Sequence, residues 1–139
     1  MIRKMRTEDY ERVYSLWQTC SGVGINSIDD SKDNIEHFID KNNEFCLVAE
    51  ENNEIVGTVL AGYDGRRAYI YHTAVRDDMR RQGIGKKLVE EELKQFERIG
   101  VSKAAGVVFV DNISAQEFWK KCGFTVRKDL YYIGREVNK

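Results

Sequence analysis

Near the middle of the chain stands the stretch Arg80-Arg81-Gln82-Gly83-Ile84-Gly85-Lys86-Lys87, between a strand-like segment (68–75) and a segment of helical periodicity (85–100). Four cations therefore crowd the start of a predicted helix, where the macrodipole is already positive and backbone N–H groups lack partners. This pattern destabilises an isolated helix. A multiply charged anion would reverse the effect, because glycines allow close approach, amides point at the anion and cations surround it. The stretch therefore predicts a site for the pyrophosphate of a nucleotide-like cofactor.

The segments around this stretch alternate between strand and helix periodicity. Three strand-like segments joined by turns predict an antiparallel meander, and the strand–helix–strand step across residues 68–110 predicts one parallel pair. We therefore expect an α/β protein with a mixed sheet, helices on both faces and the order β-α-α-β-β-β-α-β-α-β-β. The expected strands are residues 2–6, 45–49, 55–63, 68–75 and 104–110, with one or two more in 124–137. The expected helices are one capped by Thr7, then 32–41, 85–100 and one from Asp111 or Asn112 to Cys122.

The chain has 139 residues and a formal net charge of −1, so we expect one domain (1–139) with no general attraction to nucleic acid or membranes. An odd number of cysteines, three in all, argues against a disulfide framework and for reduced thiols in the cytoplasm. No targeting segment, membrane span or metal-ligand cluster is recognisable. The expected partner is a small ligand, and the chain is expected to be a monomer or a homodimer.

Three glycine-rich motifs compete at the anion site. The dinucleotide fingerprint needs a third glycine where Leu88 stands. The nucleoside-triphosphate loop needs glycine at position 80 and serine or threonine after Lys86, but Arg80 and Lys87 occupy these positions. The pattern that remains is Arg80-x-x-Gly83-x-Gly85.

This pattern resembles the Gln/Arg-x-x-Gly-x-Gly/Ala motif of the GCN5-related N-acetyltransferase (GNAT) superfamily. A second block, Asn112-x-x-Ala115-x-x-Phe118-Trp119-x-x-x-Gly123-Phe124, is similar to that family's N-x-x-A-x-x-L/F-Y-x-x-x-G-F. The resemblance implies the GNAT acyl-CoA N-acyltransferase fold and transfer of an acetyl group from acetyl-CoA to a primary amine in a ternary complex. The chain looks most like short bacterial members of the ribosomal-protein alanine N-acetyltransferase type. The expected cofactor-binding residues are Thr73, Ala74, Val75, Arg80, Arg81, Gln82, Gly83, Ile84, Gly85, Lys86, Asn112, Ala115, Phe118 and Trp119.

By the same resemblance, the pantetheine arm lies between two splayed parallel strands, here residues 71–75 and 106–110. A free backbone N–H near Ala74 or Val75 would polarise the thioester carbonyl. Trp119 replaces the family's usual tyrosine, and an indole donates a hydrogen bond but no proton. Trp119 is therefore either a weakened partner of the leaving sulfur or a core aromatic. Tyr131 or Tyr132 could also reach the site.

His72 is the first candidate for the general base, because it lies on the strand that lines the acetyl site and histidine ordinarily titrates near pH 6.5. The alternative is a structural hydrogen-bonding role, since no partner is visible in the sequence. Tyr69, Tyr71, Glu44 or a water chain are weaker candidates, and His37 is expected at the surface.

The acceptor pocket of the family is walled by the loop after the first helix and by the last strands, here residues 22–30 and 128–134. Asp29 and Asp30 either attract a cationic amine or help to cap the second helix. The acceptor is expected to be a small molecule or a peptide N-terminus. A non-catalytic acyl-CoA sensor is the alternative. RNA binding is disfavoured because the basic cluster lacks stacking aromatics.

Overall fold

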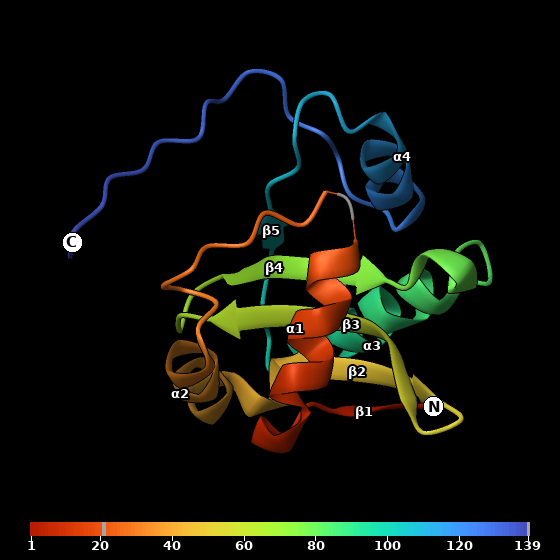
Figure 1. Ribbon diagram of the computed structural model, residues 1–139. Helices are drawn as coiled ribbons and strands as arrows, with labels where there is room; N and C mark the ends of the chain where they lie inside the picture. Colours follow the sequence, from red (N-terminus) through yellow and green to blue (C-terminus); the bar gives the residue numbers. More distant parts are fainter. Residues whose placement is uncertain (21, 139) are drawn as a thin grey trace.

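A mixed β-sheet forms the centre of the molecule in the computed structural model, which describes residues 1–20 and 22–138 (Figure 1). Within these residues the sheet has the strand order β1-β2-β3-β4-β5. The first four strands pair antiparallel, whereas β5 runs parallel to β4. This is the expected meander followed by one crossover. The strands are β1 (Ile2–Lys4), β2 (Cys46–Glu51), β3 (Glu54–Tyr63), β4 (Ala68–Val75) and β5 (Ala104–Gly106).

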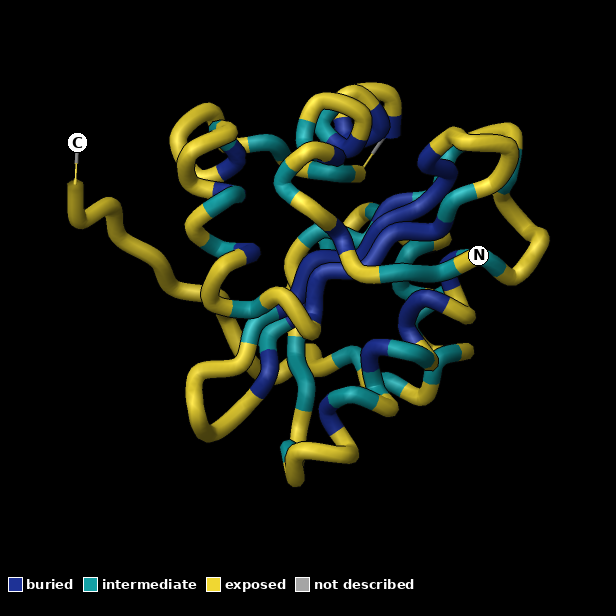
Figure 2. Tube along the Cα trace, turned by 90° about the horizontal axis from the view of Figure 1, so that it is seen from below, coloured by how far each residue is buried: buried dark blue, intermediate teal, exposed yellow. Residues whose placement is uncertain are grey.

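Helices cover both faces of the sheet, as the sequence predicts (Figure 1). One face carries α1 (Tyr10–Thr19) and α2 (Lys32–Asn42), and their apolar side chains form one core with Val48, Leu60 and Ala74. The other face carries α3 (Ile84–Arg98) and α4 (Ile113–Lys121) over a second core. Figure 2 shows the buried strands enclosed between these layers. Each of the described helices is too short or too polar to cross a membrane.

Caps at the first two helices differ from the expectation. Thr7 does not cap the first helix; instead the buried Asp9 carboxylate accepts a hydrogen bond of 2.8 Å from the Arg6 amide. Burial alone would raise the pKa of Asp9, but hydrogen bonds from Arg3, Arg6 and Arg12 lower it to about 2. Ser31 caps α2 by accepting from the Asn34 amide at 3.3 Å, which leaves Asp30 free to turn inward.

The C-terminal part of the expected order is wrong. β5 ends at Gly106, and the apolar residues after it are not buried, with Val110 90% exposed. Residues 124–138 contain no strand and run away from the sheet (Figure 1). The β-branched and aromatic residues of this tail do not by themselves produce a strand. Their β-propensity mainly reflects packing against a neighbouring strand, which residues 124–138 lack.

The helical spacing of apolar residues predicts that the buried side of α3 consists of Ile84, Leu88, Val89, Leu93, Phe96 and Ile99. The structure also buries Glu92 on this helix. Ile99 is 41% exposed. Neither carboxyl oxygen of Glu92 has a hydrogen-bond partner among the described residues, and burial raises its pKa to about 9. Burial and the nearby Glu92 raise the pKa of the Cys46 thiol to about 12. Both groups are therefore neutral in the folded protein at pH 7.

We predict that Glu92 makes the fold less stable as pH rises. The unfolded chain ionises this carboxyl near its ordinary pKa of 4.5, whereas the folded chain keeps it protonated up to about pH 9. The stabilisation is therefore complete below pH 4.5 and is lost as pH rises toward 9, with a slope of about 1.4 kcal/mol per pH unit. Urea unfolding at pH 6, 7 and 8 should show this slope in the parent and not in Glu92→Gln.

Glu97→Gln is the matched control, because Glu97 is exposed on the same helix. It should keep the parent's slope. Parallel stability–pH curves for the parent and Glu92→Gln would contradict the prediction.

Candidate active site and cofactor loop

A β-bulge in β4 determines how the site is arranged. Ala61 pairs with Ile70 and Val59 pairs with Thr73, so Tyr71 and His72 together lie opposite a single residue of β3. Side chains alternate between the faces of a strand, and a bulge resets this alternation. Tyr71 and His72 consequently both face α1 and α2. The ring of Tyr71 lies 5.5 Å from that of Phe38 on α2.

The bulge also marks the point where β4 and β5 separate. Their pairing covers only residues 68–70 of β4 and ends at Ile70 and Gly106, directly before the bulge. A bulged strand bends locally, which carries β4 away from its neighbour. The loss of pairing agrees with the splayed arrangement implied by the resemblance, although residues 107–110 form no strand.

One backbone amide of β4 is directed toward the resulting gap. The Arg76 amide donates to the Val56 carbonyl at 2.8 Å, so the alternation of an antiparallel ladder directs the Ala74 amide toward β3 and the Val75 amide toward the gap. This favours Val75 over Ala74 as the amide donor. The Thr73 hydroxyl is buried and has no partner among the described residues. Such an unpaired group fits a site that a polar ligand completes.

His72 has a buried acidic partner. Its Nε2 lies 2.9 Å from Oδ1 of Asp30, and only 17% of the His72 side chain and 7% of the Asp30 side chain are exposed. The indole of Trp17 packs edge-on against the imidazole, with ring centroids 4.7 Å apart. The structure therefore supplies the partner that was not visible in the sequence.

Asp30 is itself held by the loop and by α1. Its Oδ2 accepts a hydrogen bond of 2.9 Å from the Asn26 amide, and its carbonyl accepts one of 2.6 Å from the Tyr10 hydroxyl. Asp30 thus ties residues 22–30, the expected acceptor loop, to the strand that carries His72. Neither Asp30 nor Trp17 could be assigned this role from sequence, because one precedes a helix and the other lies in an apolar helical stripe.

The loop before α3 has the geometry of an anion site. Gly83, with φ +81°, is the N-cap residue of α3, and Arg81 has φ +64°. Left-handed residues of this kind form concave arrangements of successive N–H groups, which bind anions. The first turn of α3 contains no acidic residue, and its N-cap glycine has no side chain that could accept a hydrogen bond from the first amides. A Cβ added at Gly83 would meet no atom within 4 Å, so the space above the loop is open.

Gly85 is required for close packing, whereas Gly83 leaves open space above the loop. A Cβ added to Gly85 would lie 3.1 Å from the ring of Phe118 and 3.3 Å from Val75. The glycine therefore lets α3 pack closely against α4 and β4. Its backbone amide remains at the start of the helix.

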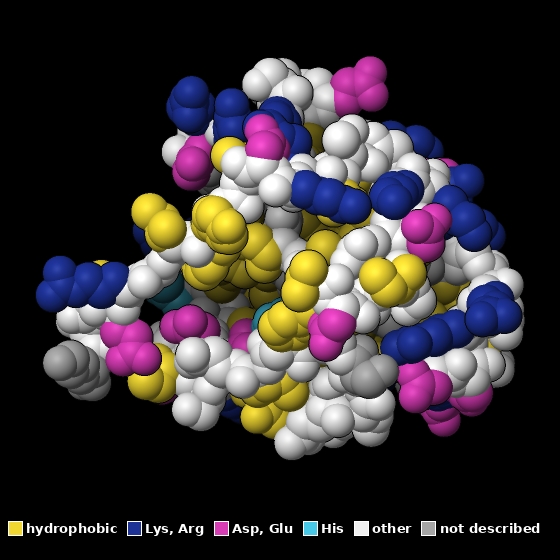
Figure 3. Space-filling model, turned by 90° about the horizontal axis from the view of Figure 1, so that it is seen from above, with side chains coloured by type: hydrophobic (Ala, Val, Ile, Leu, Met, Phe, Trp, Pro, Cys, Tyr) yellow, Lys and Arg dark blue, Asp and Glu magenta, His cyan; other side chains and the backbone are white. Residues whose placement is uncertain are grey.

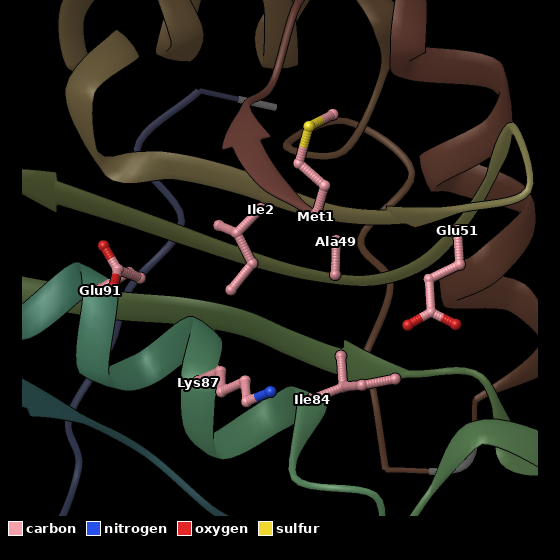
Figure 4. Close-up of a pocket in the computed structure, with 7 residues that line it drawn as sticks. All are labelled: Met1, Ile2, Ala49, Glu51, Ile84, Lys87 and Glu91. Carbon is pink, nitrogen blue, oxygen red and sulfur yellow. The ribbon is translucent and has the colours of Figure 1, made fainter.

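The cations of the loop are more dispersed than the sequence suggests. The Arg80 guanidinium donates a hydrogen bond of 3.4 Å to the Val75 carbonyl and forms an ion pair of 3.1 Å with Asp77. Lys86 lies 4.0 Å from Glu90. Lys87 extends along α3 toward Ile84 in a separate groove of about 340 Å³ (Figure 4). Exposed backbone amides, rather than four converging side chains, are therefore the main feature of the loop.

The groove around Lys87 lies between α3 and the edge formed by β1 and β2. It is flanked by the carboxylates of Glu51 and Glu91, which suit neither a pyrophosphate nor a thioester. It is separate from the gap between β4 and β5. Its lining residues are Met1, Ile2, Ala49, Glu51, Ile84, Lys87 and Glu91.

The second sequence block forms α4 and its contacts. The Asn112 side chain caps this helix by accepting from the Ala115 amide at 3.1 Å. Trp119 packs between Phe118 and Phe124, with ring centroids 5.2 and 4.9 Å apart, and contacts the α3-side core. These contacts support the packing role for Trp119. Contact with the leaving sulfur stays a prediction.

The structure does not bring Tyr131 or Glu44 to His72. Tyr131 is 97% exposed on the C-terminal tail. Glu44 is ion-paired with Lys4 at 3.5 Å and Arg98 at 3.9 Å. His37 is exposed on α2, as expected.

Seen from above, hydrophobic side chains surround a hollow with acidic and histidine side chains at its rim (Figure 3).

Tyr69 and Tyr71 lie beside one another next to this site, with ring centroids 4.6 Å apart. Burial and the neighbouring Tyr132 raise the pKa of both phenols, which makes them poorer proton acceptors at neutral pH. His72 is therefore the best placed of the candidate bases.

Comparison with known proteins identifies the family. Residues 10–124 match the model of the Acetyltransferase (GNAT) family. "Acetyltransferase SG1711" of Sodalis glossinidius is 29% identical over 136 residues, which cover 98% of this chain and 94% of that protein. The crystal structure of Ard1 from Thermoplasma volcanium superposes with a TM-score of 0.81 at 26% identity, over 91% of this chain and 83% of the other.

A further solved structure, the PaiA N-acetyltransferase of Thermoplasma acidophilum in complex with coenzyme A, also has a TM-score of 0.81, at 20% identity over 91% of this chain and 90% of that one. This likeness shows the fold. The family match extends over most of the chain, from α1 through the cofactor loop to the end of α4. The chain therefore belongs to the GNAT family of acetyltransferases and is an acyltransferase of the acetyl-CoA-dependent N-acetyltransferase class.

Proposed function

We propose that the protein transfers the acetyl group of acetyl-CoA directly to the primary amine of a small molecule or a protein N-terminus, with His72 as general base. The observation that carries this proposal is the bulge in β4. It places His72 on the face of the strand that α1 and α2 cover, while the Val75 amide is directed toward the gap between β4 and β5. A base and an amide donor are thus only three residues apart.

Acetyl-CoA fits the two parts of this site, which are the loop of residues 81–86 and the gap between β4 and β5. The amides of residues 81–86 would hold its pyrophosphate, and the open space above Gly83 would admit it. The pantetheine arm would enter the gap between β4 and β5, where the Thr73 hydroxyl lacks a partner among the described residues.

The chemical step needs three functions. His72 accepts a proton from the ammonium form of the acceptor, and the neutral nitrogen attacks the thioester carbon. The Val75 amide donates a hydrogen bond to the oxygen that becomes negative in the tetrahedral intermediate. The carbonyl then re-forms, the C–S bond breaks and CoA leaves as a thiolate, while the newly bonded nitrogen releases its second proton to water so that a neutral amide remains. A thiol has a pKa of about 8.5, so the sulfur can leave without a proton from Trp119.

The names of two structural neighbours indicate the class of acceptor. The ribosomal-protein-S18-alanine N-acetyltransferase of Escherichia coli and the diaminobutyrate acetyltransferase of Paenibacillus lautus share the fold at 21% and 24% identity. Their names describe a protein and a small diamino acid as acceptors. We include both classes, and we place the protein in the cytoplasm because its cysteines Cys20, Cys46 and Cys122 are unpaired thiols.

We predict that CoA stabilises the protein through its pyrophosphate. Free CoA at one hundred times its Kd should stabilise the fold by about 2.7 kcal/mol. Pantetheine, which lacks the phosphates, should stabilise it much less at the same concentration. Thermal unfolding with each ligand measures this difference, and equal shifts in Tm would contradict the placement of the pyrophosphate.

We predict that Gly83→Val weakens CoA binding and preserves the fold. The new side chain would occupy the open space above the loop and strain a left-handed residue. The Kd for CoA, measured by calorimetry, should rise by about tenfold or more, equivalent to about 1.4 kcal/mol.

Gly65→Val provides the matched control for backbone strain. Gly65 also has a positive φ, of +95°, and open space around it, but it lies in the turn between β3 and β4. This variant should bind CoA like the parent. The prediction is wrong if both variants lose affinity equally or if Gly83→Val binds normally.

We predict that His72→Ala removes the acidic limb from the pH profile of kcat/KM. Loss of a general base should lower turnover by about 10²-fold or more while CoA binding is kept. Turnover between pH 5 and 9 with one amine identified by screening measures this effect, and His37→Ala serves as the exposed control. An unchanged acidic limb in His72→Ala would exclude His72 as the base.

A further inference from the structure

We propose that Asp30 is a positioning residue for acetyl transfer: its carboxylate fixes the Nε2–H tautomer of His72 and leaves Nδ1 as the proton acceptor. This inference rests on the function proposed above. Asp30 lies 42 residues from His72 in the sequence, and the contact exists only in the folded chain.

The first step of the argument is the chemistry of a buried carboxylate. An ionised carboxylate can only accept hydrogen bonds, and it must find donors when it is removed from water. Among the described residues, Asp30 has one such donor on each oxygen, the Asn26 amide on Oδ2 and His72 Nε2 on Oδ1. In this arrangement Nε2 carries the proton.

The second step concerns the other ring nitrogen. A neutral imidazole has one proton, so a proton on Nε2 leaves a lone pair on Nδ1. No described residue forms a hydrogen bond with Nδ1 of His72. The ring is held in this orientation by Trp17, which packs edge-on against it, and part of the side chain remains exposed.

The third step concerns the positive charge that His72 carries after it has accepted a proton. Once Nδ1 accepts a proton, the imidazolium lies directly against the Asp30 carboxylate, which stabilises it. The titratable groups nearby are Tyr10 on α1, whose hydroxyl bonds the Asp30 carbonyl, Tyr14, which stacks on Tyr10, and Tyr71 beside His72 on β4. Asp29, the next acidic residue on the loop, is exposed. Asp30 is the one acid in hydrogen-bonding contact with His72 among the described residues.

The tautomer can be tested without any acetyl acceptor. The chain has only two histidines, so long-range ¹H–¹⁵N spectra of the parent are assigned by comparison with His72→Ala. We expect the neutral form of His72 to carry its proton on Nε2. In Asp30→Asn the amide group can donate to Nε2, so the proton should move to Nδ1. A parent with the proton on Nδ1 would overturn the proposal, even if Asp30→Asn did not fold.

Kinetics then test whether the tautomer matters for catalysis. Asp30→Asn should lower kcat by about 10²-fold or more, the range expected for loss of a general base, and should change the KM for acetyl-CoA by less than about threefold. Asp33→Asn makes the same change of charge at an exposed position of α2 and should behave like the parent. Normal kcat in Asp30→Asn would overturn the proposal.

A double variant separates positioning from a purely structural role. If Asp30 acts through His72, the double variant Asp30→Asn/His72→Ala should be no slower than His72→Ala alone. Losses that multiply would show that Asp30 acts independently and would overturn the proposal.

If the parent acetylates none of the screened amines, the proposed function fails, whereas the tautomer measured by NMR still decides whether Asp30 orients His72.

Discussion

The arrangement of the site depends on one extra residue in β4. The antiparallel pairing of β3 and β4 continues on both sides of the bulge, so the insertion cannot slip out of register without breaking the ladder. It places Tyr71 and His72 on the same face of the sheet, although neighbouring residues of a regular strand point to opposite faces. It also coincides with the end of the pairing between β4 and β5. A local irregularity thus lies where the gap begins and directs the histidine toward α1 and α2.

Three buried carboxyl groups show how environment sets the behaviour of the same chemical group. Asp9 is surrounded by donors from Arg3, Arg6 and Arg12, which outweigh burial and hold its pKa at about 2. Asp30 has one donor on each oxygen and links a loop to a strand. Glu92 has no donor among the described residues, and burial holds its pKa at about 9. The first two connect segments of the chain through hydrogen bonds, whereas the third is a neutral part of the core.

The cofactor loop illustrates a similar division of roles. Gly83 provides a left-handed backbone and open space, while Gly85 provides close packing against Phe118 and Val75. Arg80 bonds the Val75 carbonyl, so the loop is tied to the end of β4. Direct contacts between β4, α3 and α4 thus link the loop to the strand end that borders the gap. This arrangement suits a ligand with a phosphate at one end and a reactive group at the other.

The sequence by itself determined the meander, the positions of the helices and the family, because hydrophobic periodicity and turn residues act locally and the motif Arg80-x-x-Gly83-x-Gly85 is continuous. It also indicated His72 as a candidate. Only the tertiary structure decided that His72 faces Asp30 and Trp17, because a bulge reverses the alternation on which sequence periodicity relies. The burial of Glu92 and the absence of strands from residues 124–138 were likewise decided by which surfaces meet in three dimensions. Neither propensity nor spacing contains that information, since both describe a segment and not its neighbours.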